Sequence, residues 1–232
     1  MKRLGHALLA ALLTLAAPAL AQQSPVVVEL FTSQGCSSCP AADKLLHELA
    51  EREDVIALGL HVDYWDYIGW KDPFGDPAHA ERQRAYAAAG GRHMIYTPEM
   101  VVQGQTDIVG AKPMKLSQAI ATHTKKGPQI NLVLERRGDD LTIRAVPLGA
   151  LSGPLTVHML RYTPRATTQI KRGENAGHTY DYANIVEGWQ VLTTWDGQAV
   201  LSLTASAPGD KPAVILIQRD GTGPILAAAR LR

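Results

Sequence analysis

The sequence predicts an α/β domain, with a central mixed sheet and helices on both faces, followed by an all-β sandwich domain of immunoglobulin-like type. Two observations give this prediction. Up to residue 127, apolar runs of strand length alternate with segments of helical periodicity, which is typical of a sheet covered by helices. From residue 128 to residue 232, short strand-like runs follow one another with turn signals between them, as in a sandwich.

Composition and charge limit what the chain can be. It has 232 residues, of which 46% are hydrophobic and 19% charged, as in ordinary globular proteins. Residues 1–21 have the pattern of an export signal, with two basic residues, an apolar core and a cleavage motif at Ala19-Leu20-Ala21. We therefore expect a periplasmic or secreted protein that starts near Gln22. The charges are nearly balanced, with no basic block, so we expect no nucleic-acid partner. No later apolar run resembles a membrane span, so we expect none after signal removal.

The predicted α/β domain covers residues 22–127, and each of its elements has local signals. β-Branched and apolar runs of strand length indicate its strands, and helical spacing bounded by Pro or Gly indicates its helices. The strands are a run from Val26, residues 54–62 and a hairpin of residues 99–103 and 106–109; the helices are a segment from Pro40, residues 78–89 and residues 114–125.

The predicted sandwich covers residues 128–232 and contains seven short strands separated by turns such as Asp196-Gly197 and Asp220-Gly221. The stretch from Pro164 to Glu187 is different, because it is long and polar. We interpret it as a connection, and connections of such length are usually functional or mobile. The predicted strands are residues 129–136, 141–147, 155–163, 190–195, 199–205, 213–219 and 225–231.

The two cysteines of the chain, Cys36 and Cys39, lie where the first strand gives way to the first helix. Unpaired N–H groups and the helix dipole at such a place stabilise a thiolate, the reactive form of cysteine. The alternative is a structural disulfide, but a ring so small restrains the unfolded chain by only about 2 kcal/mol. We therefore favour redox chemistry, in which Cys36 attacks and Cys39 resolves the mixed disulfide. Ser37 and Ser38 between them add hydroxyls but no charge.

Three stretches carry a family resemblance: ELFTSQGCSSCP around the cysteines, HVDYWDYIGWKDPF after the second strand, and YTPEMVVQG around Thr97-Pro98. Together they resemble a family of secreted bacterial thioredoxin-like proteins that is classed only as a domain of unknown function. The resemblance implies a thioredoxin fold in which Pro98 is cis and faces the cysteine pair. It also implies that the Thr97 backbone pairs with an extended substrate strand. It brings no reaction with it.

Glu29 is an unusual residue for the first strand. An acid in a central parallel strand is buried, and a buried carboxyl can exchange a proton with a nearby thiol. The position resembles the buried acid of thioredoxin if one residue is inserted between Glu29 and Cys36. The alternative is that Glu29 forms hydrogen bonds with Thr32, Ser33 or another backbone group.

Two further sets of side chains could serve a site. Thiolates with an imidazole suit Cu(I) or Zn(II), and His93 is the best placed of the candidate ligands. However, no second C-x-x-C supports a metal, so we predict neither metal nor cofactor. The aromatic side chains between residues 64 and 70 could line a groove, although core packing is the better interpretation. They are Tyr64, Trp65, Tyr67 and Trp70.

The sequence therefore predicts an exported thiol–disulfide oxidoreductase that acts on a protein or a small-molecule thiol or disulfide. Its catalytic residues are expected to be Cys36, Cys39, Thr97, Pro98 and Glu29. The direction of the reaction and the redox partner stay open. The alternative is a non-enzymatic binding module whose cysteines are structural or hold Cu(I) or Zn(II).

Overall fold

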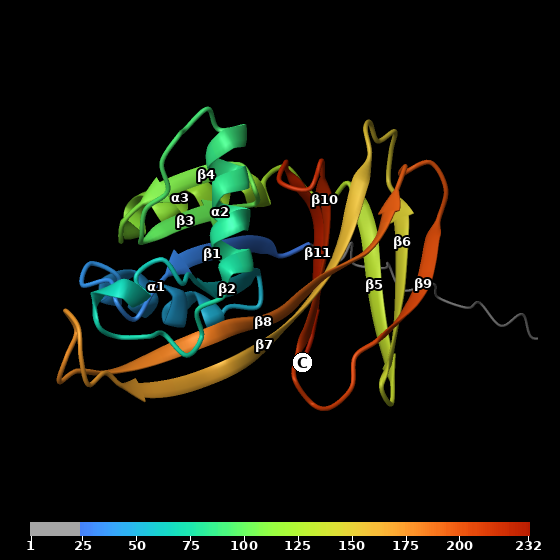
Figure 1. The fold of residues 1–232 in the computed structure, drawn as a ribbon. Coiled ribbons are helices and arrows are strands. Elements are labelled where there is room, and N and C mark those ends of the chain that lie inside the picture. The colour runs from blue at the N-terminus through green and yellow to red at the C-terminus, as the bar shows by residue number, and fades with distance from the viewer. Residues whose placement is uncertain (1–23) are drawn as a thin grey trace, which may run out of the picture.

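The computed structural model describes residues 24–232 (Figure 1), so the predicted export signal lies outside the described residues. Most local elements predicted from the sequence are confirmed with small shifts at their ends. In chain order the elements are β1 (Val26–Thr32), α1 (Pro40–Ala50), β2 (Val55–His61), the 3₁₀-helix η1 (Asp66–Ile68), α2 (Pro77–Ala89), β3 (Glu99–Val102), β4 (Thr106–Val109), α3 (Pro113–Thr124), β5 (Ile130–Arg137), β6 (Asp140–Pro147), β7 (Leu155–Gln169), β8 (Thr179–Trp195), β9 (Leu201–Ser206), β10 (Ala213–Arg219) and β11 (Ile225–Leu231). However, β7 and β8 are much longer than the predicted strands 155–163 and 190–195.

Most strands belong to one large mixed sheet. Its eight strands lie in the order β11-β10-β7-β8-β2-β1-β3-β4, and the three remaining strands form a second sheet in the order β5-β6-β9. β1 is parallel to β2, with Val28 opposite Ala57, and antiparallel to β3. β8 joins the other edge of β2 through the pair Gly59 and Ile185. The large sheet therefore contains strands from both halves of the chain.

The predicted fold class is wrong. The expected α/β domain with its own helix-covered sheet does not stand apart from an all-β sandwich, because β1–β4 continue directly into β8, β7, β10 and β11. Only three α-helices occur among the described residues, and they accompany the N-terminal half of the sheet (Figure 1). The structure is thus mostly sheet, and a boundary at residue 127 falls between strands that share one sheet.

The source of this error is the polar stretch from Pro164 to Glu187. It is not a connection: most of it forms the outer part of a long antiparallel hairpin made by β7 and β8, with Thr167 paired to Asp181. Many of its side chains are exposed, because a two-stranded arm beyond the main core has little to bury. Its composition therefore resembles that of a loop. In Figure 1 this arm reaches from the C-terminal strands to the side of the molecule that holds α1.

The helices pack on the sheet through separate apolar clusters. α1 and α3 cover the face of β1 that carries Val28 and Leu30, whereas Val27 and Phe31 on the other face pack with α2. This second cluster also includes Leu160 and other side chains from β7, β8 and β10. A third cluster fills the space between the C-terminal strands of the large sheet and the three-stranded sheet. The N-terminal core is therefore completed by residues beyond position 128.

The start of α1 differs from the start of α2. The Asp76 side chain caps α2 by accepting a hydrogen bond from the Ala78 amide at 2.8 Å. α1 has Cys39 at its N-cap position and no side-chain cap. The Ala42 and Asp43 amides donate to the Cys39 carbonyl oxygen at 2.8 and 3.1 Å, and the helix dipole places partial positive charge at the end that adjoins the cysteines.

Within residues 24–232, we find no helix with the length and apolar character needed to cross a membrane.

Candidate functional site

The cysteines form a disulfide at the junction of β1 and α1, as their spacing allows. The Cys36 and Cys39 Cα atoms are 5.5 Å apart. Cys36 is 2% exposed and Cys39 is fully buried, so Cys36 is the member of the pair nearer to solvent. Access to its sulfur is nevertheless narrow.

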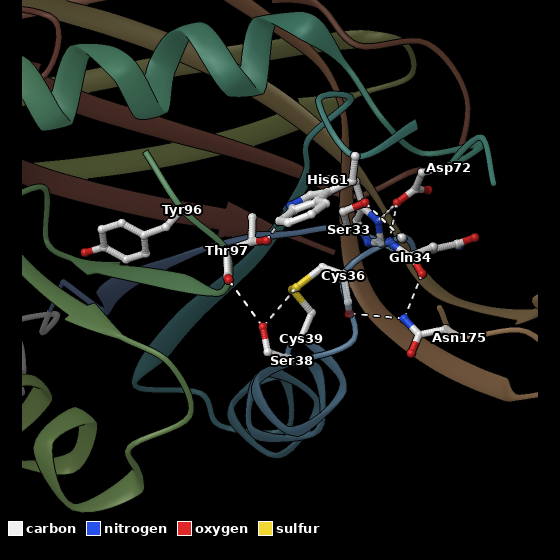
Figure 2. Close-up of a disulfide and its surroundings, with 12 residues drawn as sticks. Ser33, Gln34, Cys36, Ser38, Cys39, His61, Asp72, Tyr96, Thr97 and Asn175 are labelled. Atoms are coloured by element: carbon white, nitrogen blue, oxygen red, sulfur yellow. Dashed lines mark hydrogen bonds and ion pairs between the residues drawn. A yellow bond between two sulfur atoms is a disulfide. The ribbon is translucent and has the colours of Figure 1, made fainter. Parts of the chain in front are cut away.

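Ser38 connects the disulfide to the Thr97-Pro98 turn (Figure 2). Its Oγ lies 3.3 Å from Cys36 Sγ and donates a hydrogen bond to the Thr97 carbonyl oxygen at 3.4 Å. The Thr97-Pro98 peptide bond is cis, so its predicted isomer and its predicted place beside the disulfide are both confirmed. Trp65 Nε1 donates to Thr97 Oγ1 at 2.7 Å, which fixes the turn from a second side.

The buried acid Asp72 holds the start of the loop that carries the cysteines. Asp72 Oδ2 accepts hydrogen bonds from the Gln34 amide at 2.8 Å and lies 2.7 Å from His61 Nδ1. Both side chains are almost fully buried. Neither had been predicted as part of the site, because Asp72 lies in an irregular segment and His61 at the end of a strand. The Asp72 carboxylate thus positions the loop without contacting sulfur.

The tip of the β7–β8 arm contacts the same loop. Asn175, which is 5% exposed, donates from Nδ2 to the carbonyl oxygens of Gln34 and Cys36 at 2.9 and 3.1 Å (Figure 2). The Gln34 side chain donates a hydrogen bond to Thr168 Oγ1 at 3.1 Å and accepts one from the Trp70 indole at 2.9 Å. Side chains from the C-terminal half therefore complete the surroundings of the disulfide.

Asp43 is the buried acid that sequence reasoning missed. It lies on α1 one turn after Cys39, and residues four apart share a helix face. It is 7% exposed, and burial raises the pKa of its carboxyl to about 6, against the opposing pull of His61. The signal that could have revealed it is an acid among the apolar positions on the inner side of α1.

Glu29 is fully buried, as predicted, but its partners are different from those expected. Arg82 Nε donates to Glu29 Oε1 at 2.6 Å, and the Tyr86 hydroxyl donates to Oε2 at 2.6 Å. Both partners belong to α2. Since side chains alternate along a strand, Glu29 points to the face opposite Val28 and Leu30, away from α1. Its observed role is to anchor α2 on the sheet.

The aromatic segment after β2 is core only in part, because Tyr64 and Trp65 pack, half-buried, against the apolar cluster around Phe31. Tyr67 is 80% exposed, and its ring stacks on Trp65 with centroids 6.4 Å apart. Trp65 also packs against the cysteine loop, because a Cβ placed on Gly35 would lie 3.0 Å from Trp65 Cβ. The core interpretation is therefore wrong for Tyr67, whose exposed ring stacks on the half-buried Trp65 next to the cysteine loop.

No metal-binding cluster accompanies the thiols in the part of the chain that the structure describes, where no group of three or more His, Cys, Asp or Glu side chains could hold an ion. His93, the best candidate from the sequence, is exposed.

The fold and the site define a class of protein: a mostly-sheet protein whose large mixed sheet carries a C-x-x-C disulfide at the start of a helix, beside a cis-proline turn. The chain belongs to a family described as protein of unknown function (DUF1223), whose pattern matches residues 27–218. Membership of a family of unknown function is thus confirmed, while nothing in this match supports the thioredoxin part of the resemblance.

Two solved structures are similar to this chain. A protein from Agrobacterium tumefaciens, determined by X-ray crystallography in a structural genomics programme, is 30% identical with a TM-score of 0.78, and the match covers 91% of this chain and 96% of that one. HBP35 of Porphyromonas gingivalis is 14% identical with a TM-score of 0.62, over 90% of this chain and 75% of that one. At such low identity the second match shows the fold alone. No curated protein matches the chain.

Proposed function

We propose that this protein is an exported thiol–disulfide oxidoreductase that uses the Cys36–Cys39 pair on a protein or small-molecule thiol or disulfide. One observation carries the proposal. The disulfide lies against the uncapped start of α1, with the Ser38 hydroxyl 3.3 Å from Cys36 Sγ. The positive end of the helix dipole and a hydroxyl both stabilise a thiolate at this position.

The exchange has two steps in the direction of substrate reduction. The Cys36 thiolate attacks one sulfur of a substrate disulfide, so that a Cys36–substrate disulfide forms and the other substrate sulfur leaves as a thiolate that takes up a proton. Cys39 then loses its proton and attacks Cys36 Sγ. This re-forms the Cys36–Cys39 disulfide and releases the second substrate thiol. Two electrons pass from the protein to the substrate, and the same steps in reverse oxidise a dithiol.

Two side chains have the chemistry to assist these steps. Ser38 donates to the Thr97 carbonyl while the disulfide is present, and its single hydrogen can turn to Cys36 Sγ once a thiolate forms. Asp43 lies one helical turn from Cys39, and a carboxyl with a pKa of about 6 can accept a proton near neutral pH. In this account Asp43 is the base that activates Cys39, in place of the predicted Glu29.

A second candidate is a non-enzymatic binding module with a permanent disulfide. The 2% exposure of Cys36 favours it, because a sulfur so well covered meets few thiols. Exposed Tyr67 beside the disulfide is compatible with either candidate.

A redox titration separates the two. Protein equilibrated with graded ratios of reduced and oxidised glutathione should pass between dithiol and disulfide forms, since catalytic pairs have potentials within the range of such buffers. A Cys39→Ala variant should trap a mixed disulfide on Cys36, and a Cys36→Ala variant is the matched control that should trap far less. A disulfide that stays oxidised throughout the titration supports the binding module instead.

A further inference from the structure

The loop that carries Cys36 is held by two side chains, one from each half of the chain. From one side, Asp72 accepts a hydrogen bond from the Gln34 amide at 2.8 Å. From the other side, Asn175 donates to the Gln34 and Cys36 carbonyl oxygens at 2.9 and 3.1 Å. The Asn175 amide group uses its two N–H bonds on two carbonyls that flank Gly35, so it fixes the direction of both peptide planes.

Asn175 is held in turn by the tip of the β7–β8 arm. The tip is tied across its base by hydrogen bonds from the Ile170 amide to the His178 carbonyl at 2.9 Å and from the Gly177 amide to the Ile170 carbonyl at 2.8 Å. Ile170 is almost fully buried. Gly173, with φ of 77°, packs close to Trp70, and a Cβ there would lie 3.3 Å from Trp70 Cβ. The arm therefore presents Asn175 from a defined turn.

We propose that Asn175 is a positioning residue for the redox disulfide: it holds the loop so that Cys36 Sγ faces the start of α1. This inference rests on the proposed function. The Cys36 carbonyl oxygen also accepts the Cys39 amide at 3.2 Å, so its direction is linked to the first turn of the helix. Two N–H groups that draw charge from the neighbouring carbonyls also lower the negative potential at the sulfur. Both effects stabilise the Cys36 thiolate.

The test compares Asn175→Ala with wild-type protein in three measurements: alkylation of reduced protein, the glutathione titration and the melting temperature. Reduced protein is alkylated with iodoacetamide at graded pH, and peptide mass spectrometry follows Cys36 separately from Cys39. We expect the Cys36 thiol pKa to rise and its alkylation rate at neutral pH to fall about fivefold, the factor that one hydrogen bond typically contributes. The midpoint of the glutathione titration should move towards easier oxidation, because the reduced thiolate form has lost stabilisation.

A matched control separates positioning from general destabilisation. Asn184 in β8 is also buried and also donates its side-chain amide to a backbone carbonyl, that of Ala57 at 2.9 Å. Its φ of 46° makes glycine the substitution that avoids backbone strain. Asn184→Gly should lower the melting temperature but leave the Cys36 pKa and the titration midpoint as in wild type. Asn175→Ser, whose hydroxyl can donate to only one carbonyl, should fall between Asn175→Ala and wild type, and it serves if Asn175→Ala does not fold.

The outcomes distinguish this inference from the proposed function. Suppose that wild-type protein exchanges with glutathione, and that the Asn175 variants have the same Cys36 pKa and the same titration midpoint as wild type and differ only in a lower melting temperature. Asn175 is then merely structural and the inference is wrong. If Asn184→Gly shifts the Cys36 pKa as much as Asn175→Ala does, general loosening explains the effect and the inference is also wrong. A wild-type disulfide that does not exchange at all overturns the proposed function, and this inference with it.

Discussion

Asn175 and Cys36 are 139 residues apart in the chain, yet the Asn175 side-chain amide donates to the Cys36 carbonyl oxygen at 3.1 Å. This contact joins the two halves of the molecule at the disulfide itself. It also explains why the C-terminal half cannot be treated as an accessory to a finished N-terminal domain. The loop that carries Cys36 depends on strands that follow residue 128.

A chain that ends at Gly127 should therefore not fold on its own. It lacks β8, the partner of β2 at Gly59, and it loses Leu160, Tyr162 and Leu216 from the apolar cluster around Phe31. An unpaired β2 edge and an exposed core favour aggregation. Size-exclusion chromatography and far-UV circular dichroism of the truncated chain measure this. A soluble monomer with a cooperative unfolding transition would show that the N-terminal half is an independent domain after all.

Replacing Ser38 with alanine should make Cys36 less reactive. The Ser38 hydroxyl lies 3.3 Å from Cys36 Sγ, and loss of one hydrogen bond to a thiolate should slow alkylation of reduced Cys36 about fivefold at neutral pH. Ser37→Ala is the matched control, because Ser37 is also exposed on the same loop. Equal effects from the two substitutions would remove Ser38 from the account.

Asp43 should make stability depend on pH. Burial raises the pKa of its carboxyl from an ordinary 3.8 to about 6, so the folded protein holds this proton more tightly than the unfolded chain does. The stabilisation from that proton is complete below about pH 4 and is lost as the pH rises through 6. The shift corresponds to about 3 kcal/mol at most.

Asp43→Asn should consequently raise the free energy of unfolding at pH 8 by up to about 3 kcal/mol and have much less effect at pH 4. Denaturant unfolding at both pH values measures the difference. If Asp43 is also the base that activates Cys39, the variant should exchange more slowly near neutral pH despite its higher stability. A variant that is less stable than wild type at pH 8 would contradict the conclusion that burial raises the pKa of the Asp43 carboxyl.

Glu29→Gln should destabilise the protein without changing the chemistry of the disulfide. The substitution leaves Arg82, which is nearly buried, without its charge partner, at a cost of about 3 kcal/mol or more. Glu81→Gln, which removes the exposed pair with Arg84, should cost less than about 1 kcal/mol. Urea unfolding compares the two variants. An altered alkylation rate of Cys36 in folded Glu29→Gln protein would return Glu29 to the candidate site.

The short elements could be predicted because their signals are local. Pro40, Pro77 and Pro113 open the helices, and runs of apolar residues indicate the inner strands. The two halves of the large sheet meet where β8 pairs with β2 at Gly59 and Ile185, and no local pattern reveals a pairing between residues so far apart in the chain.

The site could be predicted in part for the same reason. Cys36, Cys39 and the Thr97-Pro98 turn have sequence signatures, and the structure brings them together. The roles of Asp72 and Asn175 come from tertiary contacts of an irregular segment and a hairpin tip, so the sequence alone does not reveal them. Glu29 was correctly expected to be buried, but its partner Arg82 lies on a helix more than fifty residues later, and that distance concealed the ion pair.

The most direct test of the account is the equilibrium titration of full-length wild-type protein between reduced and oxidised glutathione, with the state of Cys36 and Cys39 read by mass spectrometry after acid quenching. We predict a reversible transition between dithiol and disulfide within the range of the buffer, the same whether it is approached from the reduced or the oxidised protein. A Cys36–Cys39 disulfide that persists at every glutathione ratio, in protein that is shown to be folded, would contradict it.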